Sequence, residues 1–387
     1  MFSPREAVKK YLESIGFHNP NYYQNYLSNQ PFIPSEREIR EVQDFIRRLK
    51  SKVTNFYYAN GIPVKVYEVG STAKGTFVRG DFDVDIYVLT YDPERAFKLA
   101  KYLFPQGKQK FGALLIWHFI ENHFDVDLVF AHPESIKTET LKHTPFFRRY
   151  LTPEMKHEVA KAKAFFKTRG VYSAEIGGIT GVAIEELIRR YKTLDNVCRY
   201  LASCKEKPFI QDPVVSKPRN LLASIIPKRW KQIQEACREY LQTRKIRYKP
   251  FSEEDFRRRY WSYMILEFNR RLDKATDFFT ARSITLHAAN FLRNFEPECR
   301  FDYDVFVTGK KILIAIDAQP KHLTETKKIC IHSRFEKAIE KFILEHPNAY
   351  REGEYICAYV KRKFTNPLEA YANEIIKRMK ERGYDLI

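Results

Sequence analysis

The feature that most constrains the fold of this chain is the segment Gly80–Leu89, which reads GDFDVDIYVL and alternates acidic and apolar residues. Successive side chains of a β-strand point to opposite faces, so Asp81, Asp83 and Asp85 are predicted to share one face. The apolar residues between them are predicted to face a core. Because neighbouring carboxylates repel one another, a bound cation would relieve the repulsion. The segment therefore predicts a strand that carries a cation site.

A glycine-serine pair precedes this strand, and a second acidic strand follows it. Gly70 allows the backbone to come close to a phosphate, and Ser71 offers a hydroxyl and a backbone N–H to phosphate oxygens. Asp83 and Asp85 offer carboxylate oxygens, the ligands that Mg²⁺ prefers when it also binds substrate phosphates. The segment HFDVDLVF supplies a third acid from Asp125 and Asp127, which share one face of that strand. The ordered set predicts a magnesium site that binds a phosphate-bearing substrate.

Two aspartates at this spacing also have a simpler explanation, because acidic residues at a strand edge discourage aggregation. The segment FDYDVFVTGK contains such a pair, Asp302 and Asp304, but no glycine-serine pair precedes it. Thr308-Gly309 in the same segment is predicted to form a hairpin turn. We interpret this second pair as structural.

Charge and composition narrow the class of partner. The 387 residues include 67 Lys and Arg against 48 Asp and Glu, so the formal net charge is +19. This excess favours a polyanionic partner, nucleic acid before an anionic membrane. No apolar run approaches the ~18 residues of a membrane span, and MFSPREAVKKYLES lacks the apolar segment of a secretory signal. The six cysteines form no C-x-x-C pair and are interpreted as reduced thiols of a cytoplasmic protein.

The pattern along the chain predicts an α+β protein of three regions, residues 1–141, 142–249 and 250–387. The first combines N-terminal helices with a mixed sheet, the second is mainly helical, and the third alternates strands and helices. Helices are predicted to open at Ser35 and to cover Asp92–Phe104, Lys156–Arg169, Thr180–Tyr191 and Ser333–His346. Strands are predicted within Val64–Gly70, Asp81–Leu89, Ala113–Ile120, His123–Ala131, Ser262–Arg271, Asp304–Asp317 and Glu354–Phe364.

The Gly-Ser turn, the paired acids and the later third acid together resemble the DNA polymerase beta-like nucleotidyltransferase superfamily. Further along, VDLVF, HTPFFRRYL, KTRGVYSAE, GITGVAIEELI and DPVVSKPRN occur in the order found in archaeal (class I) CCA-adding enzymes, the tRNA nucleotidyltransferases. RKFTNPLEAYAN resembles the last domain of that family. The resemblance runs from about Val64 and is weak between about Phe251 and Arg351. It implies a catalytic head at residues 1–141, a helical central domain with the nucleotide pocket, and an α/β C-terminal domain that binds RNA.

The resemblance also implies a reaction. The expected enzyme adds CMP, CMP and AMP from CTP and ATP to the 3′ end of tRNA without a template. Asp83, Asp85 and Asp127 are its expected catalytic residues, and they would hold two Mg²⁺ ions. tRNA, CTP and ATP are the expected partners, no membrane is expected, and the oligomeric state stays open, with a homodimer among the options. A related A-adding or oligoadenylate-synthesising enzyme and an inert RNA-binding protein remain as alternatives.

Further residues are assigned to nucleotide binding by the resemblance. They are Gly70, Ser71 and Lys74 at the triphosphate, Thr144, Lys163 and Tyr172 in the nucleotide pocket, and Arg219 at the incoming base. Glu185 matches an acid of the family without a clear role. Without the resemblance, the simpler interpretations are favoured: Lys163 as a lysine on a helix surface, Tyr172 as a core aromatic and Arg219 as a loop charge.

Several positions depart from the family pattern. Lys142-His143 stand where Asp-Arg is common, Phe147 stands where histidine is common, and Lys74 stands where arginine is common. The string Glu254–Arg258 matches the E-D-x-x-R base-reading motif of the bacterial-type (class II) enzymes. Because Ser252 and Asp255 have the spacing of a capping box, we interpret that string as a helix start.

Overall fold

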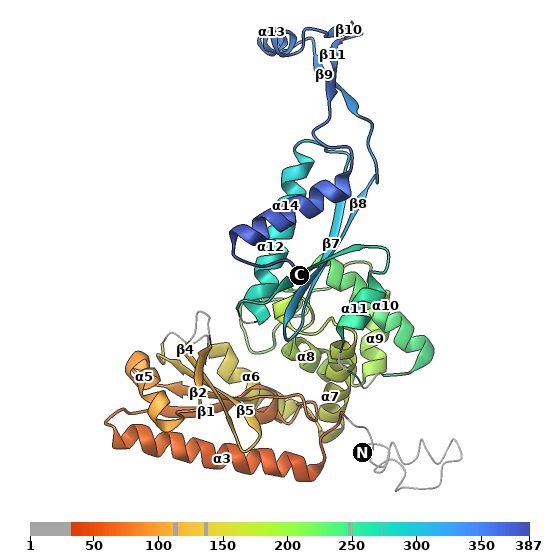
Figure 1. The fold of residues 1–387 in the computed structure, drawn as a ribbon. Coiled ribbons are helices and arrows are strands. Elements are labelled where there is room, and N and C mark those ends of the chain that lie inside the picture. The colour runs from red at the N-terminus through yellow and green to blue at the C-terminus, as the bar shows by residue number, and fades with distance from the viewer. Residues whose placement is uncertain (1–31, 111–114, 135–137, 247–248, 250, 273) are drawn as a thin grey trace, which may run out of the picture. The chain divides into compact units, whose positions relative to one another are not determined.

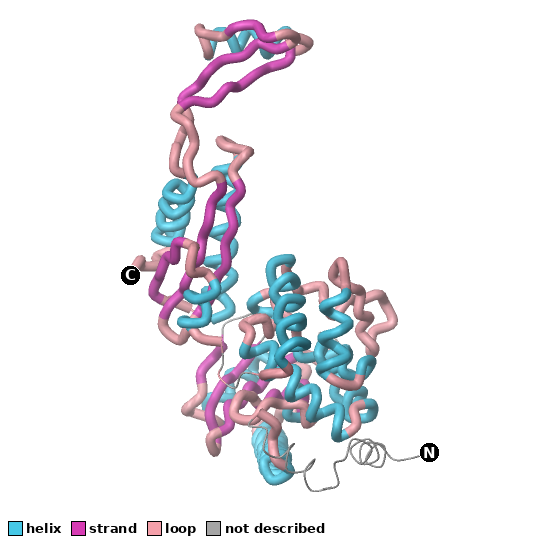
Figure 2. The backbone as a smooth tube through the Cα atoms, turned by 90° about the vertical axis from the view of Figure 1, so that its right-hand side faces the viewer, coloured by secondary structure: helices cyan, strands magenta, loops and turns pink. Residues whose placement is uncertain are grey.

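The computed structural model describes residues 32–387 except 111–114, 135–137, 247–248, 250 and 273. It divides into two compact units, Met1–Phe251 and Ser252–Ile387, and each contains both helices and strands (Figures 1 and 2). The expected multidomain α+β class is confirmed, whereas the boundary near residue 141 stays a prediction. Helices expected within residues 1–31 lie outside the described residues. In the described part of the chain, no helix has the length and apolar character that crossing a membrane requires.

The first unit begins, in its described part, with a long helix and continues through a sheet into a helical region. Its elements are α3 (Glu36–Ala59), β1 (Lys65–Val69), α4 (Gly70–Lys74), β2 (Val84–Leu89), α5 (Pro93–Leu103), β3 (Lys108–Lys110), β4 (Leu115–Glu121), β5 (Phe124–Ala131), α6 (Thr138–Tyr150), α7 (Pro153–Thr168), η1 (Ala174–Ile176), α8 (Gly181–Tyr191), α9 (Leu194–Ser203) and α10 (Pro227–Thr243).

Two predicted helix starts coincide with capping side chains. Ser35 accepts a hydrogen bond from the backbone N–H of Glu38, and the Glu38 carboxylate accepts one from the backbone N–H of Ser35. This capping box satisfies backbone donors that the first turn of α3 leaves unpaired. Asp92 caps α5 by accepting from the backbone N–H of Arg95 at 3.1 Å. Both predicted starts are confirmed.

A five-stranded mixed sheet in the order β1-β2-β5-β4-β3 forms the centre of the region before α6. β2 and β5 run parallel, and the other neighbours run antiparallel. Val84, Ile86 and Val88 are fully buried in a core that they share with apolar residues of α3 and α5. The predicted alternation is thereby confirmed, and Asp85, the acidic residue of β2, lies on the other face. β3 is an addition to the predicted strands, because Lys-Gln-Lys shows no apolar alternation.

Helices α6–α10 share a second core, in which Phe165, Leu187 and Ile233 are fully buried. The predicted helix Lys156–Arg169 corresponds to α7, and the chain leaves it through Gly170 at a φ of +66°. The predicted helix Thr180–Tyr191 corresponds to α8. Thr180 caps α8 by accepting from the backbone N–H of Ala183, so both helices are confirmed.

The second unit contains two three-stranded antiparallel sheets, in the orders β6-β8-β7 and β10-β11-β9. Helices α12 and α14 pack on the first of these sheets. The elements are α11 (Glu253–Arg259), β6 (Met264–Asn269), α12 (Lys274–Arg293), β7 (Arg300–Val307), β8 (Lys311–Gln319), β9 (Thr326–His332), α13 (Glu336–Glu345), β10 (Tyr350–Glu352), β11 (Tyr355–Lys361) and α14 (Pro367–Glu381).

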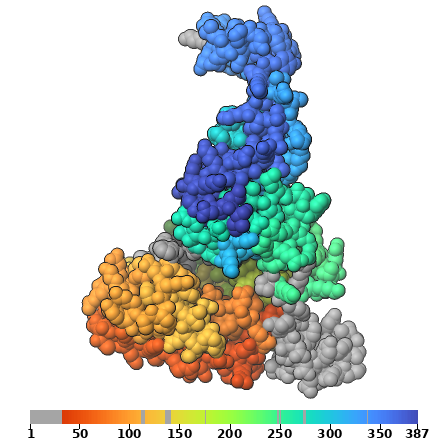
Figure 3. Space-filling model, viewed as in Figure 1, coloured from red at the N-terminus to blue at the C-terminus, as the bar shows by residue number. Residues whose placement is uncertain are grey.

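The sheet of β9, β10 and β11 forms, with α13, a lobe at one end of the second unit (Figure 3). Its register places Cys330 directly opposite Cys357 with Cα atoms 4.1 Å apart, and the two form a disulfide. The prediction of six reduced thiols is therefore wrong for this pair. The spacing of cysteines in the sequence does not reveal which of them a strand register brings together. The free cysteines are Cys198, Cys204, Cys237 and Cys299.

Candidate active site

The chain leaves β1 in a conformation that brings its backbone against a carboxylate. Val69 lies opposite Asp85 in the register of β1 and β2, and Gly70 follows with a φ of +77°. A Cβ atom at Gly70 would lie 2.1 Å from Oδ2 of Asp85, so the site requires glycine here. Gly70–Lys74 forms the short helix α4 instead of the predicted turn. Gly75 ends that helix in the left-handed conformation, as a helix C-cap commonly does.

Three carboxylates converge beside this turn. Asp83 directly precedes β2, Asp85 lies within β2, and Asp127 lies opposite Asp85 on the parallel strand β5. One oxygen of each carboxylate lies within 4.8 Å of the others. Facing residues of neighbouring strands point to the same side of a sheet, which explains the cluster. Within the part of the chain that the structure describes, no other group of at least three His, Cys, Asp or Glu has this spacing.

Two residues that the sequence does not single out bind the third carboxylate. Nζ of Lys110, in β3, lies 2.5 Å from Oδ2 of Asp127, and Nδ1 of His118 lies 2.9 Å from Oδ1. His118 stands opposite Asp127 in the antiparallel register of β4 and β5. Because this register decides which side chain faces Asp127, the sequence pattern alone carries little signal for either residue.

The electrostatics of the cluster suit a divalent cation. Burial raises the pKa of Asp85 to about 7, and repulsion from Asp83 and Asp127 adds to the shift. Burial and the charge of Asp127 also raise the pKa of Asp83, although Lys110 opposes this shift. Carboxylate oxygens are the hard ligands that Mg²⁺ takes, and its charge would favour their ionised forms. The residues present therefore fit the expected kind of metal.

The two lysines assigned to the nucleotide both bind one buried carboxylate, that of Glu185. Nζ of Lys74 lies 2.5 Å from Oε2 of Glu185, and Nζ of Lys163 lies 2.9 Å from Oε1. Lys163 also donates to the carbonyl oxygen of Thr76 at 3.0 Å and to its hydroxyl at 3.1 Å. The Thr76 hydroxyl in turn donates to Glu185 at 2.6 Å. The cluster links α4 to α7 and α8.

The cluster contains two lysines but one carboxylate, and these groups shift one another's pKa values. Burial alone would raise the pKa of Glu185, but Lys163, Lys74 and the hydrogen bond from Thr76 lower it to about 2. Burial lowers the pKa of Lys163 to about 8, although the charge of Glu185 opposes the shift. Since two lysines share one carboxylate, the ionised cluster carries an excess of positive charge.

The remaining pocket residues lie near these clusters in different ways. Ser71 is half-buried in the first turn of α4. Tyr172 and Lys163 both pack against Gly181, where a Cβ atom would lie 3.0 Å from the Tyr172 hydroxyl. The Thr144 hydroxyl is buried and has no hydrogen-bond partner among the described residues. A buried hydroxyl in this state costs free energy unless a ligand or water satisfies it.

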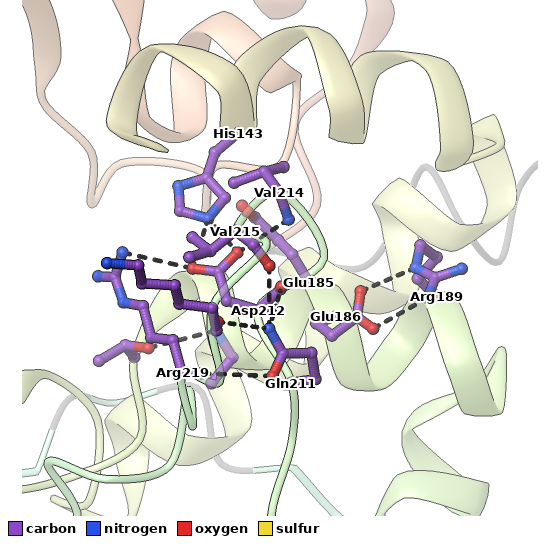
Figure 4. A network of polar contacts seen from close by, with 12 residues as sticks. His143, Glu185, Glu186, Arg189, Gln211, Asp212, Val214, Val215 and Arg219 are labelled. Atoms are coloured by element: carbon purple, nitrogen blue, oxygen red, sulfur yellow. Dashed lines mark hydrogen bonds and ion pairs between the residues drawn. The ribbon is translucent and has the colours of Figure 1, made fainter. Parts of the chain in front are cut away.

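A polar network holds the loop between α9 and α10 that contains Arg219 (Figure 4). Asp212 is fully buried at its centre and accepts from the backbone N–H of Val214 at 3.1 Å. Nε2 of His143 lies 2.9 Å from Oδ1 of Asp212, and Nη1 of Arg219 lies 3.5 Å from Oδ2. Gln211 accepts from the backbone N–H of Arg219. The Arg219 guanidinium is thus held beside a carboxylate while 47% of its side chain is exposed.

Three of the positions that depart from the family pattern, His143, Phe147 and Lys74, have structural partners here. His143 binds Asp212, and its ring centroid lies 6.0 Å from that of Phe147. Phe147 is fully buried in the helical core, and Nζ of Lys74 lies 5.5 Å from its ring centroid. Lys142 is exposed. Two of these departures therefore pack against each other, and one of the two also contacts Lys74.

Two acidic segments that the sequence analysis interpreted as structural, the pair Asp302 and Asp304 and the string Glu254–Arg258, make local contacts. Asp302 accepts a hydrogen bond from the Tyr263 hydroxyl at 2.7 Å, and Asp304 accepts one from the Tyr260 hydroxyl. These bonds support the structural interpretation of that pair. The capping box of Ser252 and Asp255 at the start of α11 is confirmed.

Comparison with known proteins agrees with this geometry. Residues 43–165, which include all three aspartates, match the nucleotidyltransferase domain family. The CCA-adding enzyme of Archaeoglobus fulgidus is 25% identical over 241 residues, which cover 54% of this chain and 53% of that enzyme. The CCA-adding enzyme of Thermoplasma acidophilum is 28% identical over 226 residues, which cover 54% of this chain and 51% of that enzyme. The chain thus spans about half the length of these curated relatives.

Solved structures that match part of the chain include those of the Cid1 poly(U) polymerase and the CdnC protein of E. coli MS115-1. The first is 12% identical, with a TM-score of 0.46 over 60% of this chain and 96% of Cid1. The second, in a complex with HORMA-deltaN, is 15% identical, with a TM-score of 0.46 over 56% of this chain and 88% of CdnC. Residues 43–165 thus match the nucleotidyltransferase domain family, and about half of the chain is similar in sequence to archaeal CCA-adding enzymes.

Proposed function

We propose that this protein is a CCA-adding tRNA nucleotidyltransferase, which transfers CMP, CMP and AMP from CTP and ATP to the 3′ end of tRNA in the cytoplasm. The observation that carries the proposal is the convergence of Asp83, Asp85 and Asp127 beside the Gly70 turn. Sequence relatives named CCA-adding enzymes support tRNA as the substrate, and the net charge of +19 suits a polyanion.

In this reaction the 3′-oxygen of the RNA forms a bond to the α-phosphorus of the nucleotide, and the bond from that phosphorus to pyrophosphate breaks. Two Mg²⁺ ions, one held by all three aspartates and one by Asp83 and Asp85, would favour loss of the hydroxyl proton and neutralise the leaving pyrophosphate. The aspartates would align the reacting groups by their shared face of the sheet, where Asp85 of β2 lies opposite Asp127 of β5. Because alignment and charge neutralisation suffice, no protein nucleophile is required.

The triphosphate would lie along α4. Gly70 brings the first turn of α4 against Asp85, so Ser71, the next residue, would offer its hydroxyl and backbone N–H to the phosphates. Lys74, in the last turn of α4, supplies positive charge. This charge partly opposes the rise in the pKa of Asp85 that burial causes. The unsatisfied Thr144 hydroxyl is a further group that a bound nucleotide would complete.

Base choice without a template requires polar groups that match the Watson–Crick edge. We assign this role to Arg219, whose guanidinium is held beside Asp212 and stays half-exposed. A site built to pair with C and A leaves buried polar groups unpaired against U and G. The end of the RNA primer would complete the pocket.

The test is incubation of the protein with Mg²⁺, tRNA that lacks CCA and each labelled triphosphate in turn. Ordered incorporation of C, C and A is expected, and Asp85→Asn should reduce it roughly a hundredfold or more. Asp302→Asn, from the second aspartate pair, is the matched control and should retain activity. Incorporation of A alone, or synthesis of oligoadenylate without tRNA, would replace the proposal by one of its alternatives. Absence of any transfer would leave an RNA-binding protein.

A second experiment tests Arg219. Arg219→Ala is expected to lose the preference for CTP and ATP over UTP while it retains metal binding. Arg244→Ala removes another partly exposed arginine that pairs with an aspartate, and it should leave the preference unchanged. An unchanged preference in Arg219→Ala would contradict the assignment.

A further inference from the structure

Glu185 reaches out of its own helix to two lysines from two other elements. Its carboxylate lies between Nζ of Lys74, from α4, and Nζ of Lys163, from α7. The exposed fractions of the three side chains are 0% for Glu185, 5% for Lys74 and 3% for Lys163. A buried ammonium group needs a counter-charge, and two of them next to each other repel. The carboxylate therefore explains how both lysines stay inside the protein.

The neighbouring glutamate differs in this respect (Figure 4). Glu186 is equally buried, but it binds Arg189 and Arg190, which follow it on the same helix. Its ion pairs span three and four residues, as is usual for helix-stabilising pairs. Glu185 and Glu186 thus share burial, charge and helix, and only Glu185 connects to α4.

The two lysines differ in how many of their ammonium hydrogen-bond donors are already used. Lys163 donates to Glu185 and twice to Thr76, which uses all three donors of its ammonium group. For Lys74, the Glu185 carboxylate is the one hydrogen-bond acceptor found among the described residues. Lys74 therefore retains donors for an anionic ligand, whereas Lys163 contributes charge in this arrangement.

We propose that Glu185 is a positioning residue for the substrate triphosphate, because it gathers the ammonium groups of Lys74 and Lys163 at the end of α4 and keeps their charge available. The inference rests on the proposed nucleotidyltransferase function. It identifies the two lysines held by Glu185 as the positive charge that balances the substrate phosphates. The location supports it, since Lys74 ends the helix whose first residue contacts Asp85. Two lysines on one carboxylate leave the excess positive charge that a polyphosphate needs.

Other charged groups face the cluster. The positive charge of Lys167, in α7, adds to the effect of burial and lowers the pKa of Lys163. Burial, together with the negative charge of Glu185, raises the pKa of the Tyr172 hydroxyl. Glu185 is the group that opposes the loss of the Lys163 proton. Without it, Lys163 would become neutral at a lower pH than in the wild-type protein, and positive charge would be lost from the site.

The experiment measures binding of inorganic tripolyphosphate to the full chain in the presence of Mg²⁺ by calorimetry. Glu185→Gln is expected to weaken binding about tenfold or more and to raise the KM for CTP by a similar factor, with a smaller effect on kcat. Binding to this variant should recover on acidification from pH 8 to pH 6.5 relative to the wild-type protein. A merely structural role would not produce that recovery. Unchanged or tighter binding would overturn the proposal.

Glu186→Gln is the matched control, because it removes an equally buried charge from the next position of the same helix. It is expected to lower stability while it leaves tripolyphosphate affinity within about twofold of the wild-type value. A weakening equal to that of Glu185→Gln would show a general packing effect and would overturn the proposal.

The double variant Glu185→Gln, Lys163→Met tests whether Glu185 acts through the lysines. If it does, the double variant binds tripolyphosphate more tightly than the product of the two single losses predicts. Effects that multiply would contradict the mechanism. Should Glu185→Gln fail to fold, the double variant, which removes both charges of one pair, carries the test, and wild-type affinity in it would overturn the proposal.

The outcomes also separate this inference from the proposed function. If the protein binds tripolyphosphate through Glu185 but adds no nucleotide to tRNA, the CCA-adding proposal fails and the inference stands. If it adds C, C and A while Glu185→Gln binds tripolyphosphate like the wild-type protein, the inference alone fails.

Discussion

Oδ2 of Asp85 occupies the space next to Gly70, 2.1 Å from where a Cβ atom at that position would lie. Gly70 also has a left-handed backbone, with a φ of +77°. Gly61 has a similar φ of +70°, but nothing lies within 4 Å of its Cβ position. The two glycines share a conformational requirement, and only Gly70 adds a steric one that involves the active site.

We therefore expect Gly70→Ala and Gly61→Ala to differ in activity more than in stability. Each should lose about 1 to 2 kcal/mol of unfolding free energy, because alanine is strained in the left-handed region. Gly70→Ala should in addition displace the Asp85 carboxylate and abolish nucleotide transfer, whereas Gly61→Ala should retain it. Unfolding curves and transfer rates for both variants check this expectation, and equal activity would contradict it.

The stability of the first unit should depend on pH through Glu185. Its pKa in the folded protein, about 2, lies below the ordinary value of 4.5 because of Lys163 and Lys74. A carboxylate with a lowered pKa stabilises the fold above pH 4.5, and this contribution is lost as the pH falls from 4.5 towards 2. The gap in unfolding free energy between the wild-type protein and Glu185→Gln should be roughly 3 kcal/mol at pH 7 and should shrink at pH 3.

Tryptophan fluorescence can measure this difference in unfolding free energy between the wild-type protein and Glu185→Gln for the first unit alone. Trp117 and Trp230 lie in that unit, and Trp261, which is 84% exposed, lies in the second. A Trp261→Phe background removes the signal of the second unit from both proteins. A gap that stays constant between pH 7 and pH 3 would show that Glu185 is not the titrating group.

The disulfide predicts the number of reactive thiols. Cys330 and Cys357 are joined, and the other four cysteines are free. Alkylation of the unfolded, unreduced protein should modify four cysteines, and prior reduction should increase the number to six. Mass spectrometry counts the modified residues. Six modified cysteines without reduction would show that the pair is not joined in the isolated protein.

The lobe of β9–β11 predicts a contact with RNA. Tyr350, Tyr355 and Tyr359 are exposed by 37%, 47% and 55%, and the strand register places them on one face of the sheet. Nζ of Lys328 lies 5.9 Å from the Tyr350 ring centroid on the same face. Tyrosine rings beside a lysine can stack on unpaired bases while the charge attracts phosphate.

Under the proposed function, Tyr359→Ala should lower the affinity for tRNA about tenfold, since stacking on one base contributes roughly 1 to 3 kcal/mol. Tyr102→Ala serves as the control, because Tyr102 is 67% exposed on α5 in the first unit. Filter binding at a fixed salt concentration measures both variants. Equal affinities for the two variants would exclude this face from RNA binding.

The local features of the sequence predict much of the fold. Ser35, Asp92 and Thr180 cap helices where the pattern places them, and Val84 and Ile86 face the core as their alternation predicts. These features depend on neighbours within a few residues, which the sequence displays directly. For the same reason, the order of acids predicted a cluster of Asp83, Asp85 and an acid from the second acidic strand, and the family resemblance selected Asp127 as that acid.

Contacts between distant segments were decided by the tertiary structure. The register of β4 on β5 selects His118 as the partner of Asp127, and the register of β9 on β11 selects Cys330 as the partner of Cys357. No periodicity within one segment encodes such pairings. A shift by one residue would turn every side chain of a strand to the other face, so the pairing follows from the packing of the whole sheet.

Glu185 shows the same division most clearly. The sequence by itself placed this acid on a helix, and the resemblance to the CCA-adding enzymes marked Lys74 and Lys163 as candidates for the nucleotide. Only the tertiary structure brought α4, α7 and α8 together and joined the three charges in the interior. The physical reason is that a buried charge is tolerated where opposite charges from other elements meet it, and this condition exists only after the chain has folded.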